Sequence, residues 1–329
     1  MSILNRPSKG QPSILVALAK TIWGSEVTSL SADQIISRVA PASLYDPKQA
    51  QARGALNTWL KLGLFTQAKN GGIGFATDIE ASEDFKPQTL DWLRFAAREV
   101  AFRKKNNSPF WAAKHISDND EENADGLASD LSRGAAWLLA QSLDVRLVTN
   151  KQAAGLATKQ LGNFQLVLQN DTRWKPLVDW MVFLGLGIKT PDETERSRPT
   201  DEPPTALILD PAEAVSDLLP RIFSDSAELP QGTFLDLLAN ILPVVDSGIY
   251  RKQVEERMTA EWAKPAKGRL SPSLSRALLR LESVRRIKLV EKSDSGHGRS
   301  DAASSPIELW FGAKETKKVT HISFKKGSK

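Results

Sequence analysis

The chain contains no cysteine among its 329 residues. This absence excludes disulfide bonds and thiolate chemistry, and it fits a reducing compartment. Long apolar runs are also missing. The stretch from Ile14 to Ala19 is too short to span a bilayer, and it lacks a convincing signal-peptide cleavage pattern. We therefore expect a cytoplasmic protein that does not associate with a membrane.

Histidine is scarce, and no pattern joins the three that are present into a metal site. They are His115, His297 and His321, and no cysteine or tight set of carboxylates accompanies any of them. The chain has neither a Gly-x-x-x-x-Gly-Lys-Ser/Thr loop for phosphates nor a Gly-x-Ser-x-Gly nucleophile elbow. A glycine-rich segment at 71–74 falls in an expected hairpin. These absences favour a protein without a cofactor, a metal or a catalytic centre.

One carboxylate pattern leaves an alternative open. Asp78 with Asp84-Phe85-Lys86 is similar to the arrangement of many restriction-type nucleases, in which two carboxylates and a lysine hold Mg²⁺ and activate water. The strand context of such a site is missing from the expected elements. We therefore favour a solvated linker over a nuclease centre.

What the chain does have is a pattern that occurs three times: an amphipathic helix, a short apolar stop and two β-like runs around a polar loop. The copies span residues 55–76, 179–209 and 278–311. A helix followed directly by a hairpin is the last part of a winged helix, a variant of the helix-turn-helix used mainly to bind DNA or another protein. The pattern predicts a mostly α fold with small β-hairpins, an α+β class built from tandem winged helices.

Composition and helical periodicity divide the chain into four parts. Residues 1–78 are expected to form an N-terminal winged helix, and residues 79–125 a helical connector. Residues 126–210 are expected to form a degenerate winged-helix-like domain. Residues 211–329 are expected to form a C-terminal winged helix with a basic tail, whose hairpin joins 287–290 to the alternating strand at 307–311.

Local signals place the elements of the first part. Ser13 is expected to cap the first helix, and the capping-box spacing at Ser31 opens the second. Pro47 suits the first turn of the third helix, which Gly63 ends. Asn70-Gly71 predicts the turn of the hairpin.

Positive charge is concentrated toward the carboxyl terminus. The whole chain carries a net charge of +5, but the segment from Lys264 to Lys329 holds 16 Lys and Arg against 6 Asp and Glu. The remainder holds 28 basic and 33 acidic residues. A basic terminal region on a mildly acidic body favours a polyanionic partner. The alternative is a solvated basic tail, which suits Lys325, Lys326 and Lys329.

The helix expected at 272–284 separates leucines from arginines. At ~100° per residue, its leucines form a buried stripe, and Arg276 and Arg280 project from the opposite side into solvent with few carboxylates nearby. Guanidinium groups donate two parallel bonds to phosphate oxygens or guanine edges, although an ordinary charged surface would show the same pattern. The residues predicted to bind DNA here are Arg276, Arg280, Arg285, Arg286, Lys288 and Arg299.

A second candidate face lies on the third helix of the first part and is polar with modest charge. Its amides suit adenine edges and its cations suit phosphates, and a neutral surface is the equal alternative. The residues predicted to bind nucleic acid here are Lys48, Gln51, Arg53, Asn57, Thr58 and Lys61.

The helix that begins near Pro176 has apolar side chains nearly all round, so it must be buried. We expect it to pack against other parts of the chain or against a partner subunit. Trp59, Trp137 and Trp180 lie on apolar helical stripes, which favours core packing over base stacking.

The opening Ser2-Ile3-Leu4-Asn5-Arg6-Pro7-Ser8-Lys9-Gly10, which runs into an apolar helix, resembles the start of the DpdG family. The repeated pattern is similar to that of bacterial multi-winged-helix DNA-binding proteins. The DpdG resemblance implies an accessory role in antiphage defence, within bacterial gene clusters that place deazaguanine in DNA and restrict foreign DNA. Helicase and nuclease activities would then belong to separate subunits, and the resemblance marks no catalytic residues in this chain.

These observations predict a non-catalytic DNA-binding subunit of a bacterial complex, such as an antiviral defence or DNA-modification and restriction system. Its expected partners are DNA, with duplex favoured, and other subunits of a defence or DNA-processing complex. The alternative is a protein-bridging adaptor that docks ATPase or nuclease subunits through its winged helices.

Overall fold

The chain folds into two compact units. The first comprises residues 1–134 and 167–184, and the second residues 135–166 and 185–329. The domain limits expected from the sequence fall elsewhere and stay a prediction. The structure, a computed structural model, describes residues 3–4, 11–25, 30–41, 46–79, 85–86, 88–111, 126–142, 145, 149–162, 171–191, 205–292, 306–310 and 316–325.

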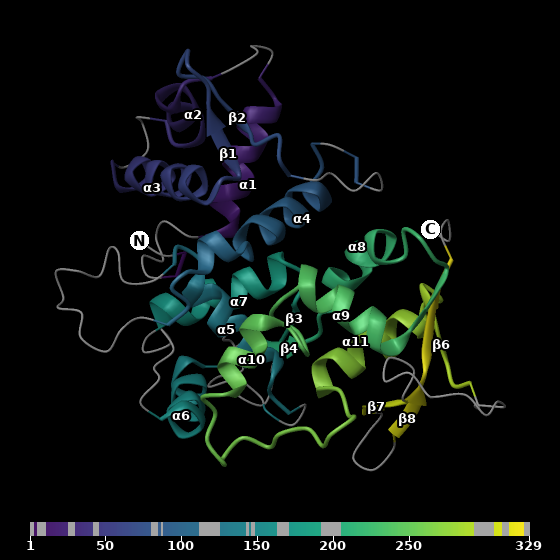
Figure 1. Ribbon diagram of the computed structural model, residues 1–329. Coiled ribbons are helices and arrows are strands. Elements are labelled where there is room, and N and C mark those ends of the chain that lie inside the picture. Colours follow the sequence, from purple (N-terminus) through teal and green to yellow (C-terminus); the bar gives the residue numbers. More distant parts are fainter. Residues whose placement is uncertain are drawn as a thin grey trace. The chain divides into compact units, whose positions relative to one another are not determined.

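The first unit is built from helices with one small hairpin (Figure 1). Its elements are α1 (Pro12–Trp23), α2 (Ala32–Val39), α3 (Asp46–Leu62), β1 (Phe65–Gln67), β2 (Ile73–Phe75), α4 (Leu90–Ala101), η2 (Lys104–Asn107), the first half of α5 (Ser129–Leu139), and α7 (Asp171–Phe183).

The expected hairpin of the first unit is confirmed. Strands β1 and β2 pair antiparallel, with Phe65 opposite Phe75, and Leu30 forms a bridge to Ile73 on the other edge of β2. The capping box at Ser31 is present as predicted. Ser13 is not a cap: α1 begins at Pro12 with Gln11 as its N-cap, two residues earlier than expected, because a proline suits the first turn, where its missing N–H is not needed.

The apolar helix α7 is buried within the first unit, which confirms that it packs against another part of the chain. The Trp180 ring lies 5.5 Å from the Trp59 ring, and both side chains are almost fully buried. The buried Arg98 guanidinium donates a hydrogen bond of 2.9 Å to the carbonyl of Leu184, just after α7 ends. Tryptophan therefore serves the core here, as its place on apolar stripes predicts.

The second unit begins with the second half of α5 and ends in two small sheets (Figure 1). Its further elements are α6 (Asn150–Leu161), β3 (Gly187–Pro191), β4 (Thr205–Leu209), α8 (Ala212–Ile222), β5 (Glu228–Pro230), α9 (Gln231–Ile241), α10 (Ile249–Glu255), α11 (Pro272–Ser283), β6 (Ile287–Val290), β7 (Ile307–Trp310), β8 (Thr316–Val319) and β9 (His321–Phe324).

The hairpin expected in the second copy is confirmed, but the one expected in the third copy is wrong. Strands β3 and β4 pair with Ile188 opposite Ile208. In the third copy, β6 pairs with β9 rather than with β7, so that Ile287 lies opposite Phe324. Strand β7 pairs instead with β8 in a separate two-stranded sheet. The segment taken as a basic tail therefore contains two strands.

The predicted pairing of β6 with β7 was wrong because β7 and β9 show the same alternation of buried and more exposed residues. Residues alternate between buried and more exposed positions in β7, and they do so again in β9. Alternation predicts a strand with one buried face, but it does not identify the partner strand. The lysines around β8 and β9 made that segment look like a solvated tail.

The first and third copies share one strand order. In each, a short extended segment between the first two helices pairs with the later of the two strands that pair after the last helix. Leu30 bridges β2 in the first unit, and β5 pairs with β9 in the second, where the sheet order is β5-β9-β6. Helices with small antiparallel sheets confirm the α+β class.

No helix in the described part of the chain is both long and apolar enough to cross a membrane.

The pairing of β9 predicts a stability effect at Ile322. This side chain is fully buried at the centre of the sheet, so Ile322→Ala should lower the free energy of unfolding by about 2–4 kcal/mol. Urea denaturation followed by circular dichroism measures the change. Lys318→Ala, at an exposed position of β8, is the control and should stay within about 0.5 kcal/mol of the parent protein. An unchanged Ile322→Ala protein would mean that the segment is a solvated tail after all.

Candidate nucleic-acid interface

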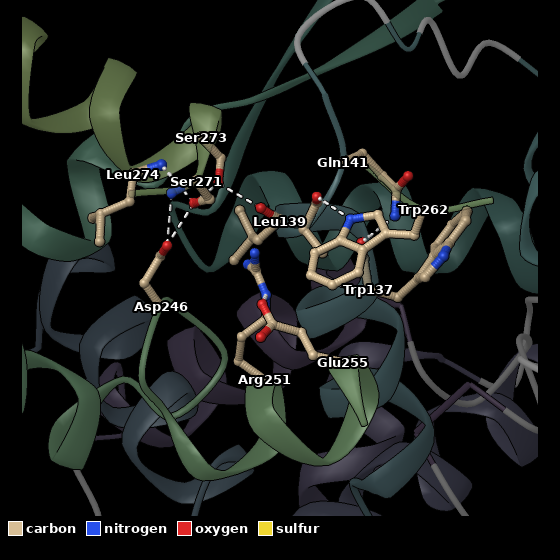
Figure 2. A network of polar contacts seen from close by, with 11 residues as sticks. Trp137, Leu139, Gln141, Asp246, Arg251, Glu255, Trp262, Ser271, Ser273 and Leu274 are labelled. Carbon is tan, nitrogen blue, oxygen red and sulfur yellow. Dashed lines mark hydrogen bonds and ion pairs between the residues drawn. The ribbon is translucent and has the colours of Figure 1, made fainter. Parts of the chain in front are cut away.

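The N-cap residue of α11, Ser271, forms hydrogen bonds through both its side chain and its backbone N–H. The Ser271 side chain accepts a hydrogen bond from the backbone N–H of Leu274, as a helix N-cap does. Its hydroxyl and its backbone N–H both donate to the Asp246 carboxylate, at 2.6 and 2.7 Å, which Figure 2 shows at the left. The start of α11 is thereby fixed to the loop before α10.

A second contact ties α11 to the end of α5. The buried Ser273 hydroxyl donates 2.6 Å to the carbonyl of Leu139 (Figure 2). One residue later in α5, the carbonyl of Ala140 accepts 3.0 Å from the Trp262 indole N–H. Buried polar groups are stable only when bonded in this way, so the register of α11 against α5 is specific. The helix is a rigid element rather than a loosely packed one.

The buried and outward faces of α11 follow the predicted periodicity. Leu274, Leu278 and Leu281 are all buried. Arg276 is half-buried, and Arg280 is exposed over 42% of its side chain. Among the residues that the structure describes, no hydrogen bond or ion pair holds the Arg276 side chain.

The prediction that Arg280 projects into solvent with few carboxylates nearby is wrong. Its Nη1 donates 2.9 Å to Oδ2 of Asp210, a residue that is only 4% exposed. The other carboxylate oxygen accepts 2.9 Å from the N–H of Ala212 at the start of α8. A buried carboxylate needs partners, so Arg280 fixes α11 to the β4–α8 junction. Periodicity within one helix cannot reveal a carboxylate that lies 70 residues away.

The single acidic residue of α11 is also neutralised from a distance. Glu282 accepts a hydrogen bond from Lys317 on β8, at 2.5 Å, and another from the backbone N–H of Leu289 on β6, at 3.1 Å. The Glu282 carboxylate is therefore bound by groups of β8 and β6.

Cations gather where α11 passes into β6. Arg285 is exposed, and Lys288 is exposed on the outer side of β6. The Arg286 guanidinium lies 5.7 Å from the centre of the Phe324 ring. Because Ile287 pairs with Phe324, the residue after β9, Lys325, lies at the same end of the sheet. We call Arg285, Arg286, Lys288 and Lys325 the basic corner.

Level with Lys288, on the far side of β9, the sheet carries a compensated carboxylate. Glu228 on β5 forms an ion pair with Lys292 and accepts a hydrogen bond of 3.1 Å from Ser323. The bond from Lys292 is the main cause that lowers the pKa of Glu228 from its ordinary value of 4.5. Desolvation opposes this shift, while Ser323 and the charge of His321 add to it.

The candidate face of the first unit is smaller than the sequence indicated. Asn57 and Lys61 are exposed, and Gln51 is half-buried. Arg53 forms an exposed ion pair of 2.7 Å with Asp33. Thr58 is only 6% exposed, and its hydroxyl donates to the carbonyl of Gly54. Helix α3 is covered from several sides because α1, α2 and β1 all pack on it, which a single stripe does not express. The side chain of Lys48 lies outside the described residues.

The described residues do not support the nuclease alternative. The carboxylate of Asp78 accepts 2.9 Å from Arg103 and is exposed, and Lys86 is exposed as well. Asp84, Arg299, His115 and His297 lie outside the described residues. Within the described ranges, no three His, Cys, Asp or Glu side chains are placed to hold a metal ion.

Sequence reasoning missed three residues that shape this surface, namely Asp210, Lys317 and Lys325. Each belongs to a strand or a strand end that reaches the interface only through tertiary pairing. No local pattern marks any of them as part of it.

Comparison with protein families matches residues 1–295 to the DpdG-like family. The match covers most of the chain, so the protein belongs to this family. It extends far beyond the opening residues that carry the resemblance in the sequence. A search of curated proteins and a search of solved structures return no match.

The Arg280–Asp210 pair predicts a measurable coupling. A double-mutant cycle with Arg280→Met and Asp210→Asn should give an interaction free energy of about 1–3 kcal/mol, because one partner is buried. The matched control is the exposed pair Arg53–Asp33, for which the same cycle should give less than about 0.5 kcal/mol. Chemical denaturation measures both. Equal coupling in the two pairs would contradict the structural role given to Arg280.

The Glu228 ion pair predicts a small pH dependence. Glu228→Gln should lower the free energy of unfolding by a few tenths of a kcal/mol near neutral pH, because the pair is well exposed. The folded-state pKa lies below the unfolded value. The contribution is therefore complete above the unfolded-state pKa and is lost as the pH falls through the folded-state pKa. Urea titrations near neutral pH and at about pH 3 should show the difference between the two proteins shrinking in acid. A difference that persists in acid would assign it to something other than the charge.

Proposed function

We propose that this protein is a non-catalytic DNA-binding subunit of a bacterial defence or DNA-modification and restriction complex, and that it binds DNA through α11 and the basic corner. The observation that carries the proposal is the accumulation of Arg285, Arg286, Lys288 and Lys325 at one end of the sheet. The local acidic groups, Glu282 and Glu228, are already neutralised by lysines. A phosphate backbone is the polyanion that such a group of cations attracts.

The strand order supports the kind of fold that such a role needs. Three helices (α1–α3) precede the paired strands β1 and β2 in the first copy, and four helices (α8–α11) precede the paired strands β6 and β9 in the third. In both copies a short extended segment between the first two helices pairs with the later of the two strands. We interpret these as tandem winged helices, in which the last helix before the hairpin is the one that enters a DNA groove. In the third copy this helix is α11, and the basic corner is its junction with the hairpin.

Membership of the DpdG-like family supports the setting of the proposal. The family points to the gene clusters that place deazaguanine in DNA and restrict foreign DNA. In such a system a DNA-binding subunit would deliver separate helicase and nuclease subunits to their substrate. That division of labour agrees with the absence of a nucleotide loop or nucleophile elbow from the sequence.

The direct test replaces two cations of the interface that do not stabilise the fold through a described ion pair. Arg276→Glu with Lys288→Glu should weaken binding to a fluorescein-labelled duplex at least tenfold at ~100 mM salt, as fluorescence anisotropy measures. The slope of log K against log salt should become shallower by about 2, because two phosphate contacts are removed. Arg280 is left intact, since a glutamate there would face the buried Asp210.

The matched control is Lys252→Glu, which reverses one exposed charge on α10. In Figure 1, α10 lies on the other side of the second unit from β6. Affinity in this control should change less than about twofold. Unchanged binding by the Arg276→Glu, Lys288→Glu protein would refute the proposed interface.

A protein-bridging adaptor is the second candidate, and membership of the DpdG-like family is what favours it. The apolar helix α7, which pointed to a docking surface in the sequence, is buried inside the chain and no longer supports this function. Gel filtration of the purified chain, with and without duplex, separates the candidates. Co-elution with duplex supports DNA binding, whereas a chain that elutes apart from duplex but together with the other subunits of its gene cluster is an adaptor.

A further inference from the structure

Three helix-to-strand corners recur in the chain, and each turns at a residue in the left-handed backbone region. In the first copy the residue is Gly63, with a φ of 87°, and in the second it is Gly185, with a φ of 73°. In the third copy it is Arg285, with a φ of 60°. Two copies thus use the residue that suits this conformation, and one does not.

The first and third corners are built by the same hydrogen bonds. The N–H of Leu64 donates to the carbonyl of Trp59, and the N–H of Arg286 donates to the carbonyl of Leu281, five residues back in both cases. This bond defines the Schellman ending of a helix, whose turning residue is usually glycine because a Cβ there crowds the backbone. The fold requires the left-handed turn at position 285, and glycine would make it with less strain.

Packing does not explain why an arginine stands there. At Gly185 a Cβ would lie 3.0 Å from the backbone of Ala214, so glycine is needed both for its φ and for space. The Arg285 side chain is exposed, and within the described part of the chain no hydrogen bond, ion pair or ring contact involves it. A strained residue with an outward-facing charge and no described role in the fold is a candidate for a functional role.

We propose that Arg285 is the principal phosphate-binding residue of the interface, and that the chain tolerates its strained backbone in order to hold a guanidinium at the end of α11. This inference rests on the proposed function. Arg285 is the exposed turning residue just after α11, next to Arg286 in the chain and three residues before Lys288 of the basic corner. There the planar guanidinium donates two parallel hydrogen bonds to the oxygens of one phosphodiester.

An arginine at this position has one other physical use, which makes the opposite prediction. A cation near the carboxyl end of a helix is stabilised by the negative end of the helix dipole. If that were its purpose, removing Arg285 would destabilise the protein. If it is retained for binding, replacing it with glycine relieves the strain and stabilises the protein.

The experiment compares Arg285→Gly with Arg285→Ala and Arg285→Lys in the full chain. Arg285→Gly should raise the melting temperature by about 1–3 °C, because the corner then matches its backbone conformation. Arg285→Ala keeps the Cβ and the strain, so its melting temperature should not rise. Both variants should bind a labelled duplex about 3- to 10-fold more weakly at ~100 mM salt, with a salt slope shallower by about 1. Arg285→Lys should keep the slope of the parent protein.

The outcomes separate this inference from the proposed function. A more stable Arg285→Gly protein with weaker DNA binding and a shallower slope supports it. Arg285→Gly with unchanged binding, while Arg276→Glu with Lys288→Glu abolishes binding, overturns the role of Arg285 and leaves the interface intact. An Arg285→Gly protein that is less stable than its parent assigns the residue to the helix dipole and overturns the inference. A parent protein that binds no duplex at low salt removes the proposed function itself.

Discussion

The carboxylate of Asp210 is the constraint on which the arrangement of the interface depends. It is 4% exposed, and a charge so nearly removed from water is stable only if its oxygens are bonded. One oxygen accepts from the start of α8 and the other from Arg280 of α11. If Arg280 turned to bind a ligand, the buried Asp210 carboxylate would lose its cationic partner. The charge of Arg280 is therefore structural, and the proposed interface depends on Arg276 and on the cations at the helix end.

Helices, caps and two of the three hairpins could be predicted from the sequence because each depends on residues close together in the chain. The capping box at Ser31, the left-handed glycine at position 63 and the pairing of β3 with β4 are of this kind. The pairing of β6 with β9 is not, since an alternating segment specifies a face and not a partner. β7 was equally suited by pattern, and only the tertiary fold selects β9.

The same distinction governs the candidate site. Helical periodicity correctly separated the leucines of α11 from its arginines. It could not show which arginine meets a carboxylate from a distant strand, nor that Lys317 on β8 would neutralise Glu282. In the first unit, Thr58 lay on the polar side of a calculated stripe, but α3 is covered on more than one side and the hydroxyl bonds to its own helix. Exposure is a property of the assembled fold.

Repulsion between the positive charges of the basic corner destabilises the folded state. Like charges gathered at one end of a small sheet repel one another, and the carboxylates near them are already engaged by other lysines. A ring face under Arg286 offsets part of this repulsion. Under the proposed function, a bound phosphate backbone would relieve more of it, and a ligand that binds only the folded state stabilises that state. The strained arginine and the repelling cations therefore point to the same class of partner by independent physical arguments, one from backbone conformation and one from charge.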